Sequence, residues 1–174
     1  STPYDFLVLS PGAAPIRPPI PGGGGPNVFV LNDLSDMDAI AAVTAGAKHA
    51  CVIGAGFIGL ELAENFRHRG LEVSLVEMQD HVMPRLDKEM TQPLLQELSL
   101  HGVRVYLDET AQTIENANVL LKSGKRIDSD FVCLCVGVRP TSKLAKDAGL
   151  EVSEHGFIRV DKHQRTSDPH IFAV

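Results

Sequence analysis

A glycine-rich turn within residues 50–64 constrains the fold more than any other part of the sequence. An apolar run ending at Ile53 leads into the pattern Gly54-x-Gly56-x-x-Gly59. In such a pattern the first glycine makes a tight turn, the second lets the backbone approach a pyrophosphate, and the third lets helix and strand pack closely. A helix that begins here would direct its free N–H groups and the positive end of its dipole at the phosphates. The stretch therefore predicts a strand, a turn and a helix that bind a dinucleotide, with a purely structural turn as the alternative.

The residues that follow the turn favour dinucleotide binding. Apolar residues recur at the four-residue spacing of a helix face, at Ile58, Leu62 and Phe66. Gly70 should end this helix, and a second strand over 72–77 ends at Glu77, 21 positions after Gly56. A carboxylate at that place accepts hydrogen bonds from the adenosine ribose and repels the 2′-phosphate of NADP(H). We therefore expect NAD(H) as the coenzyme, with NADP(H) disfavoured.

Composition and charge limit what the rest of the chain can be. The 174 residues, 44% of them hydrophobic, suffice for one domain with a sizeable core. A net charge of −6 without any basic run of five residues argues against binding to nucleic acid or to a membrane surface. No apolar stretch reaches the roughly 18 residues of a membrane span, and no signal-peptide pattern is present, so we expect a cytoplasmic protein. The seven histidines form no close ligand pair, and no metal site is expected.

The three cysteines, Cys51, Cys133 and Cys135, lie inside apolar strand-like runs. At strand spacing, Cys133 and Cys135 point to the same face, and a bond between them would be strained. We expect buried structural thiols, with a redox role as the alternative.

In chain order, the sequence predicts an α/β domain of the Rossmann type, with a central parallel sheet, flanking helices and a small antiparallel β-meander. Strands are expected over 4–10, 27–31, 50–53, 72–77, 103–107, 130–136, 157–160 and 171–174. Further helices are expected over 33–47, 87–100 and 144–148, and the meander over 111–127. The proline- and glycine-rich segment 15–26 is interpreted as a flexible linker.

Five motifs that occur in order resemble one enzyme family. They are Tyr4-Asp5 through Ala13, Gly54 to Glu64, Glu77, Gly137 to Pro140, and Thr166 to Val174. Together they are similar to the middle of a flavin-dependent pyridine nucleotide-disulfide oxidoreductase. The flanks are most similar to the branch of coenzyme A-disulfide reductases, NADH oxidases and NADH-dependent persulfide reductases. The resemblance implies an NAD(H)-binding domain over 32–155, inserted between segments 1–31 and 156–174 of an FAD domain.

The resemblance also implies which parts of such an enzyme lie outside the chain. The flavin-binding glycine motif and the redox cysteine of the family lie upstream of the Tyr4 strand, and a Gly-Asp pair follows the position of Val174. We therefore expect no catalytic residue in this chain, and neither retained FAD nor turnover by the chain alone. Its partners are expected to be a nicotinamide nucleotide and the FAD domain of a parent protein, itself a homodimer.

The resemblance places the coenzyme residue by residue. The pyrophosphate is expected over Gly54, Gly56, Phe57 and Ile58. Phe57 stands where the family has an aromatic ring that covers the flavin and swings away when nicotinamide arrives; the alternative is a core aromatic. The full expected set of coenzyme contacts is Gly54, Gly56, Phe57, Ile58, Gly59, Glu61, Glu77, Met78, Arg85, Val136 and Gly137.

Three members of this set are open to a second interpretation or rest on backbone alone. Glu61 matches a carboxylate that meets the nicotinamide carboxamide, and it could equally be a solvated helix residue. Arg85 could approach the adenosine or be an exposed surface arginine. Gly137 should offer its backbone to the nicotinamide side.

Three functions remain open at this point. In the first, NADH reduces FAD in the parent protein, and FAD reduces a disulfide, a persulfide or oxygen. In the second, a dehydrogenase passes hydride directly to a bound substrate, although neither Tyr4 nor Tyr106 has a lysine four residues on. In the third, the chain is a non-enzymatic nucleotide-sensing module. The motif order favours the first.

Overall fold

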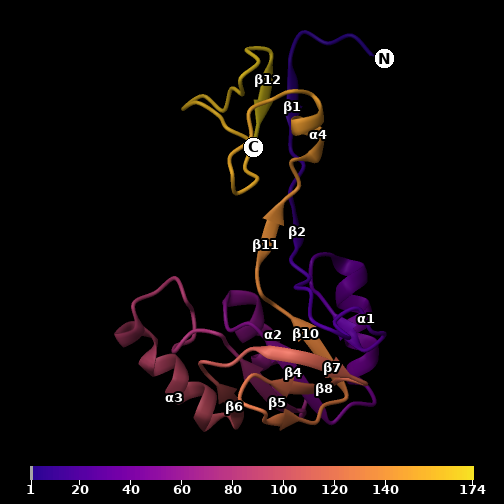
Figure 1. Ribbon diagram of the computed structural model, residues 1–174, viewed down its shortest axis with the longest axis vertical. Helices are drawn as coiled ribbons and strands as arrows, with labels where there is room; N and C mark the ends of the chain where they lie inside the picture. Colours follow the sequence, from indigo (N-terminus) through magenta and orange to yellow (C-terminus); the bar gives the residue numbers. More distant parts are fainter. Residues whose placement is uncertain (1) are drawn as a thin grey trace. The chain divides into compact units, whose positions relative to one another are not determined.

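The computed structural model describes residues 2–174 and divides into two compact units (Figure 1). One unit is Pro15–Gly137, and the other joins Ser1–Ala14 to Val138–Val174. The first unit is therefore inserted in the sequence of the second. The expected domain boundaries at 31/32 and 155/156 remain a prediction about the parent protein. No helix in residues 2–174 is both long and apolar enough to cross a membrane.

The inserted unit is built on a five-stranded sheet in which every neighbouring pair is parallel. In spatial order its strands are β3 (Val28–Phe29), β10 (Phe131–Leu134), β4 (His49–Ile53), β5 (Glu72–Val76) and β6 (Val103–Tyr106). The three middle strands are almost wholly buried, as their continuous apolar sequences require. The predicted parallel sheet is confirmed.

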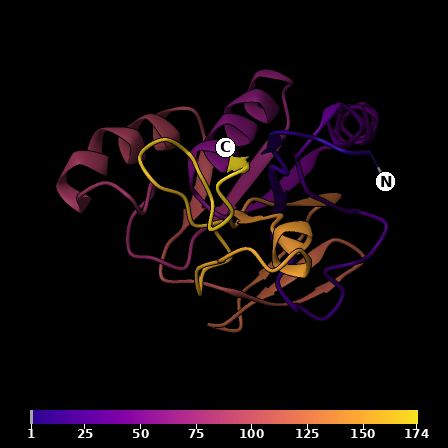
Figure 2. The ribbon, with the colours of Figure 1, turned by 90° about the horizontal axis from the view of Figure 1, so that it is seen from above.

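Successive residues of β4 point in turn to the two layers that cover opposite faces of the sheet. Ala50 and Val52 belong to a core shared with the helices α1 (Leu34–Thr44), α2 (Phe57–His68) and α3 (Gln92–Leu100). Cys51 and Ile53 belong to a second core shared with the antiparallel strands β7 (Ala111–Glu115), β8 (Asn118–Leu121) and β9 (Arg126–Ile127). Figure 2 shows the helices on one side of the sheet and this meander on the other. The predicted fold class, including the meander, is confirmed.

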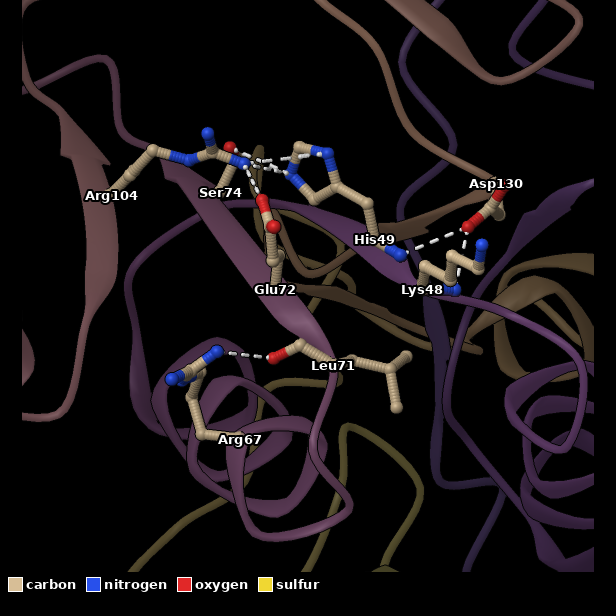
Figure 3. Close-up of polar contacts among 8 residues, drawn as sticks. All are labelled: Lys48, His49, Arg67, Leu71, Glu72, Ser74, Arg104 and Asp130. Atoms are coloured by element: carbon tan, nitrogen blue, oxygen red, sulfur yellow. Dashed lines mark hydrogen bonds and ion pairs between the residues drawn. The ribbon is translucent and has the colours of Figure 1, made fainter.

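A polar network ties the amino-terminal ends of the strands together (Figure 3). His49 begins β4 and Glu72 begins β5; Arg104 of β6 donates to Glu72 at 2.8 Å and lies 3.1 Å from His49 Nε2. The same ring nitrogen lies 3.0 Å from the hydroxyl of buried Ser74. The carboxylate of Asp130 accepts from the backbone N–H groups of residues 48 and 49. Since all five strands run the same way, this edge is opposite the one that carries the glycine turn.

Arg67 connects α2 to its neighbours, as the lower part of Figure 3 shows in part. Its guanidinium donates to the carbonyl of Leu71 at 2.6 Å and to that of His101, the C-cap of α3, at 2.8 Å. The long side chain thereby satisfies two carbonyl groups at the ends of secondary-structure elements.

The second unit is small. Strand β1 (Leu7–Leu9) pairs in parallel with β12 (Ile171–Ala173), and α4 (Lys143–Asp147) contributes Ala145 to its core. Strand β2 (Ala13–Pro15) pairs with β11 (Val138–Pro140) where the chain passes between the units. The sequence did not predict β2 or β11, because proline-containing segments of three residues carry no clear period.

The interpretation of 15–26 as a flexible linker is wrong for its glycine run. Gly22 begins a hydrogen-bonded turn in which the N–H of Gly25 donates to its carbonyl, and the N–H of Ile114 in β7 donates to the carbonyl of Pro21 at 2.9 Å. A Cβ at Gly22 would lie 1.7 Å from the Ile114 carbonyl oxygen, and its φ is +82°. The glycine is there because β7 packs against it, which composition cannot distinguish from flexibility.

Two further expectations needed correction. The helix over 87–100 is shorter, because a 3₁₀ turn (Lys88–Thr91) comes first and Pro93 lies in the first turn of α3. The strand over 157–160 is reduced to a single bridge between Val152 and Ile158. The helix expected over 33–47 is present as α1, and its N-cap is Asp33, whose carboxylate accepts from the N–H groups of residues 35 and 36.

Candidate dinucleotide-binding site

The candidate site lies at the carboxyl-terminal edge of the sheet, entirely within the inserted unit. From β4 the chain proceeds outward to β5 and β6, then returns to β10 on the other side of β4. Such a reversal of strand order leaves a crevice outside the strand ends, where ligands of open α/β sheets bind. Gly54 follows β4, Glu77 follows β5, and Val136 follows β10. The fold thus brings these three predicted positions to one edge.

Two of the three glycines are required by the packing of the protein itself. Gly54 has φ +106°, and a Cβ there would lie 2.3 Å from the carbonyl oxygen of Cys135. A Cβ at Gly59 would lie 1.9 Å from the carbonyl oxygen of Gly54. Strand, turn and helix therefore approach one another too closely for any larger residue.

Gly56 differs from both, because nothing in the described residues requires it to be glycine. It is the N-cap of α2, with φ −79° and ψ −172°, a conformation that any residue adopts. A Cβ built on it meets no atom within 4 Å. The open space above Gly56 is where the predicted close approach of a pyrophosphate would occur.

The N-terminus of α2 offers donors to that space. No side chain of residues 2–174 caps α2, whereas α1 is capped by Asp33. The first N–H groups of a helix have no intrahelical partner, so those of Phe57, Ile58 and Gly59 are available to a ligand. The first turn of α2 also holds no acidic side chain that would repel an anion.

Glu77 is buried and held by the turn itself. Its side chain accepts from the N–H of Ala55 at 2.8 Å and from the N–H of Gln79 at 2.9 Å, with 5% of the residue exposed. The carbonyl of Ala55 in turn accepts from the N–H of Met83, which fixes loop 78–86 against the glycine turn. Each carboxylate oxygen keeps a further lone pair for a ribose hydroxyl. Sequence reasoning missed the roles of Ala55 and Met83, for which no motif gives a signal.

Exposed apolar side chains surround the turn. Phe57 and Ile58 are 70% and 40% exposed at the start of α2, Met78 is 65% exposed after β5, and Val136 is 38% exposed after β10. Apolar groups left at the rim of a crevice with a few fixed polar groups are typical of ligand sites. Phe57 is therefore not a core aromatic, and the alternative interpretation of this residue is wrong.

The remaining predicted contacts are less constrained. Glu61 is exposed on α2, one turn after Phe57 on the same face, and Arg85 is exposed in the loop after β5. Neither side chain has a hydrogen bond or ion pair within residues 2–174. Gly137 has φ +106°, and its carbonyl accepts from the N–H of Ile16 at 2.9 Å. The coenzyme contacts of all three stay predictions.

Cys51 and Cys133 are buried free thiols, and Cys135 is a partly buried free thiol that packs against the core. Burial raises the pKa of Cys51 to about 12 and that of Cys135 to about 12, and it raises the pKa of Cys133 in the same direction. Thiols that resist ionisation are poor nucleophiles, which supports the structural interpretation. Among residues 2–174, no group of three or more His, Cys, Asp or Glu residues could hold a metal ion.

Comparison with known proteins gives consistent matches. An NADH oxidase of Methanocaldococcus jannaschii is 39% identical over 98% of this chain and 39% of its own length. A structure described as an NAD-dependent persulfide reductase from A. fulgidus is 39% identical with a TM-score of 0.94, covering 98% of this chain and 32% of that one. The chain thus spans between about a third and two fifths of these proteins.

A third match bears on the choice of coenzyme. The water-forming NADH oxidase of Lactobacillus brevis, bound to NADH, is 33% identical with a TM-score of 0.92, over 98% of this chain and 38% of that one. An engineered variant of it, described as an NADPH oxidase, is bound to NADPH; its five substitutions remove one aspartate and introduce two arginines.

The family model described as pyridine nucleotide-disulphide oxidoreductase matches residues 1–174, and the expected family and branch are confirmed. The chain belongs to the pyridine nucleotide-disulphide oxidoreductase family.

Proposed function

We propose that the inserted unit binds NAD(H) and is the coenzyme-binding domain of a longer flavoenzyme. In that parent protein, a homodimer, NADH would reduce FAD, and FAD would reduce a disulfide, a persulfide or oxygen. The observation that carries the proposal is the open space above Gly56, next to an uncapped helix N-terminus. The protein's own packing requires glycine at Gly54 and Gly59, whereas at Gly56 no packing contact requires it and the close approach of a ligand would.

Each part of the coenzyme would contact a different set of residues at this edge of the sheet. The amide groups of the α2 N-terminus would hold the pyrophosphate, and the carboxylate of Glu77 would accept from the adenosine ribose. Met78 and Arg85 would lie towards the adenosine. The nicotinamide side would be formed by Phe57, Glu61, Val136 and Gly137. Gly59 acts indirectly, because its missing side chain lets α2 approach the turn.

Nicotinamide and flavin supply the hydride chemistry when they are bound. This chain would supply binding and orientation. Its backbone amides neutralise the pyrophosphate charge, and Glu77 fixes the ribose. The exposed ring of Phe57 would cover the flavin in the parent protein and swing away when nicotinamide arrives.

NADH should be preferred over NADPH. A 2′-phosphate would bring about two negative charges against the buried carboxylate of Glu77, which already accepts two N–H groups and has no proton to donate. The Lactobacillus brevis pair supports the same reasoning, since its NADPH-bound variant has lost an acidic residue and gained two basic ones.

Isothermal titration of the chain with NADH tests the proposal. Gly56→Val should fold normally, because the added side chain starts in open space, yet it should abolish NADH binding by filling the pyrophosphate position. Gly46→Val is the matched control, since a Cβ there also meets nothing within 4 Å. Binding by the Gly56→Val variant as tight as by the parent would place the phosphate elsewhere and overturn the proposal.

A further inference from the structure

One carboxylate in the loop after Glu77 contacts a lysine and a histidine. Lys88 Nζ lies 2.6 Å from Asp80 Oδ2, and His81 Nδ1 lies 2.7 Å from Asp80 Oδ1. The second ring nitrogen of His81, Nε2, is buried with no hydrogen-bond partner in residues 2–174. Asp80 and Lys88 remain about half exposed, with side-chain exposures of 47% and 51%, so a bound ligand could influence the pair.

Backbone contacts fix this loop beside the proposed ribose position. The N–H of Gln79 donates to Glu77, the carbonyl of Gln79 accepts from the N–H of Asp108 at 3.0 Å, and Met83 is bound to the glycine turn. The bonded path from the Glu77 carboxylate through Gln79 to the Asp80 carboxylate is at most about 12 Å long. The straight distance cannot exceed this path, which is well within the screening length of roughly 30 Å at 0.01 M salt, so the two carboxylates interact at low ionic strength.

We propose that Asp80 is a second determinant of coenzyme choice, because it holds Lys88 in an ion pair and so withholds that ammonium group from a 2′-phosphate. The inference rests on the proposed NAD(H) site and extends it. Glu77 disfavours NADPH by direct repulsion, whereas Asp80 does so by neutralising a cation that the loop already carries.

The pair is charged throughout the neutral range. Hydrogen bonds from Lys88 and then from His81 lower the pKa of Asp80 to about 2, and Asp80 raises the pKa of Lys88. Asp108 and Glu89 also act on Lys88, at longer range and without a hydrogen bond. Lys88 would therefore still be partly compensated after Asp80 is neutralised, which limits the expected gain in NADPH affinity to about three- to tenfold.

A double-mutant cycle tests whether the effect of Asp80 depends on Lys88, and an exposed aspartate elsewhere controls for the change of net charge. The dissociation constants of NADH and NADPH are measured for the parent, Asp80→Asn, Lys88→Gln and the double variant at one low ionic strength. Asp80→Asn should tighten NADPH binding about three- to tenfold and change NADH binding less than about twofold. In the double variant the gain should disappear. Asp38→Asn on α1, an exposed residue with the same charge change, should alter neither constant.

Two outcomes would overturn the inference alone: an NADPH to NADH ratio unchanged by Asp80→Asn, or a gain that persists in the double variant. Folding of each variant is checked by circular dichroism. If Asp80→Asn fails to fold, a comparison of Lys88→Gln with the parent still tests the inference, because the loss of Lys88 must weaken NADPH binding more than NADH binding. Failure of the parent to bind either nucleotide would overturn the proposed function, and this inference with it.

Discussion

Glu77 should stabilise the folded protein in the absence of coenzyme, in addition to binding the adenosine ribose. Its carboxylate accepts from the N–H of Ala55, a residue with no exposed surface, and from the N–H of Gln79, which is exposed. In Glu77→Ala the first N–H would stay buried without a partner, at a cost of about 1–3 kcal/mol, and the second could be rehydrated at a cost of about 1 kcal/mol. The free energy of unfolding should therefore fall by about 2–4 kcal/mol.

The isosteric variant Glu77→Gln sharpens this prediction. The single amide oxygen of glutamine can accept from only one of the two N–H groups, and its NH₂ group then faces the other N–H group. The free energy of unfolding should therefore fall by about 1–2 kcal/mol. Urea unfolding followed by circular dichroism gives the comparison. Glu64→Ala, an exposed glutamate of α2, is the control and should change stability by less than about 0.5 kcal/mol. If Glu77→Ala proved as stable as this control, the two backbone hydrogen bonds would contribute nothing, and the argument from burial would be refuted.

Three further predictions concern packing, pH and thiol reactivity. Gly59→Ala should lower the free energy of unfolding by at least about 1–3 kcal/mol, because its Cβ would lie 1.9 Å from a carbonyl oxygen. Gly56→Ala should lower it by less than about 0.5 kcal/mol. Equal losses in urea unfolding would contradict the conclusion that packing requires glycine at Gly59 but not at Gly56. Burial, and to a smaller extent the charge of Arg104, lowers the pKa of His49 below 6.5 in the folded protein. As the pH falls, His49 is therefore protonated in the unfolded state before it is protonated in the folded state. The free energy of unfolding should decrease as the pH drops below about 6.5. Urea unfolding at pH 7.5 and 5.5 should show a smaller drop for His49→Gln than for the parent, and an identical drop would remove His49 as the cause. The buried Cys51 and Cys133 should react with a thiol reagent only at the rate of unfolding, and the partly buried Cys135, whose pKa is raised to about 12, should react more slowly than an unfolded thiol; labelling of native Cys135 at the rate of an unfolded thiol would contradict its raised pKa.

The central architecture could be predicted from the sequence because several local signals agree. The glycine spacing and the apolar runs of β4, β5 and β10 all indicate one arrangement, and the structure has it. Glu77 could be found because the spacing from Gly56 fixes the tip of the second strand.

The parts that could not be predicted depend on contacts between distant residues. The turn at Gly22 is glycine because β7 lies against it, 92 residues later, and nothing in its own neighbourhood says so. Likewise the ion pair of Asp80 with Lys88 needs the fold of the loop between them. The sequence shows a carboxylate near the ribose position, and only the structure shows that it neutralises a lysine.

A crystal structure of the chain soaked with NADH would show whether the coenzyme binds at the carboxyl-terminal edge of the sheet. We expect electron density for the pyrophosphate above Gly56, within hydrogen-bond distance of the first N–H groups of α2, and for the adenosine ribose next to the carboxylate of Glu77. Density for NADH at any other place, with the space above Gly56 left to water, would contradict this expectation.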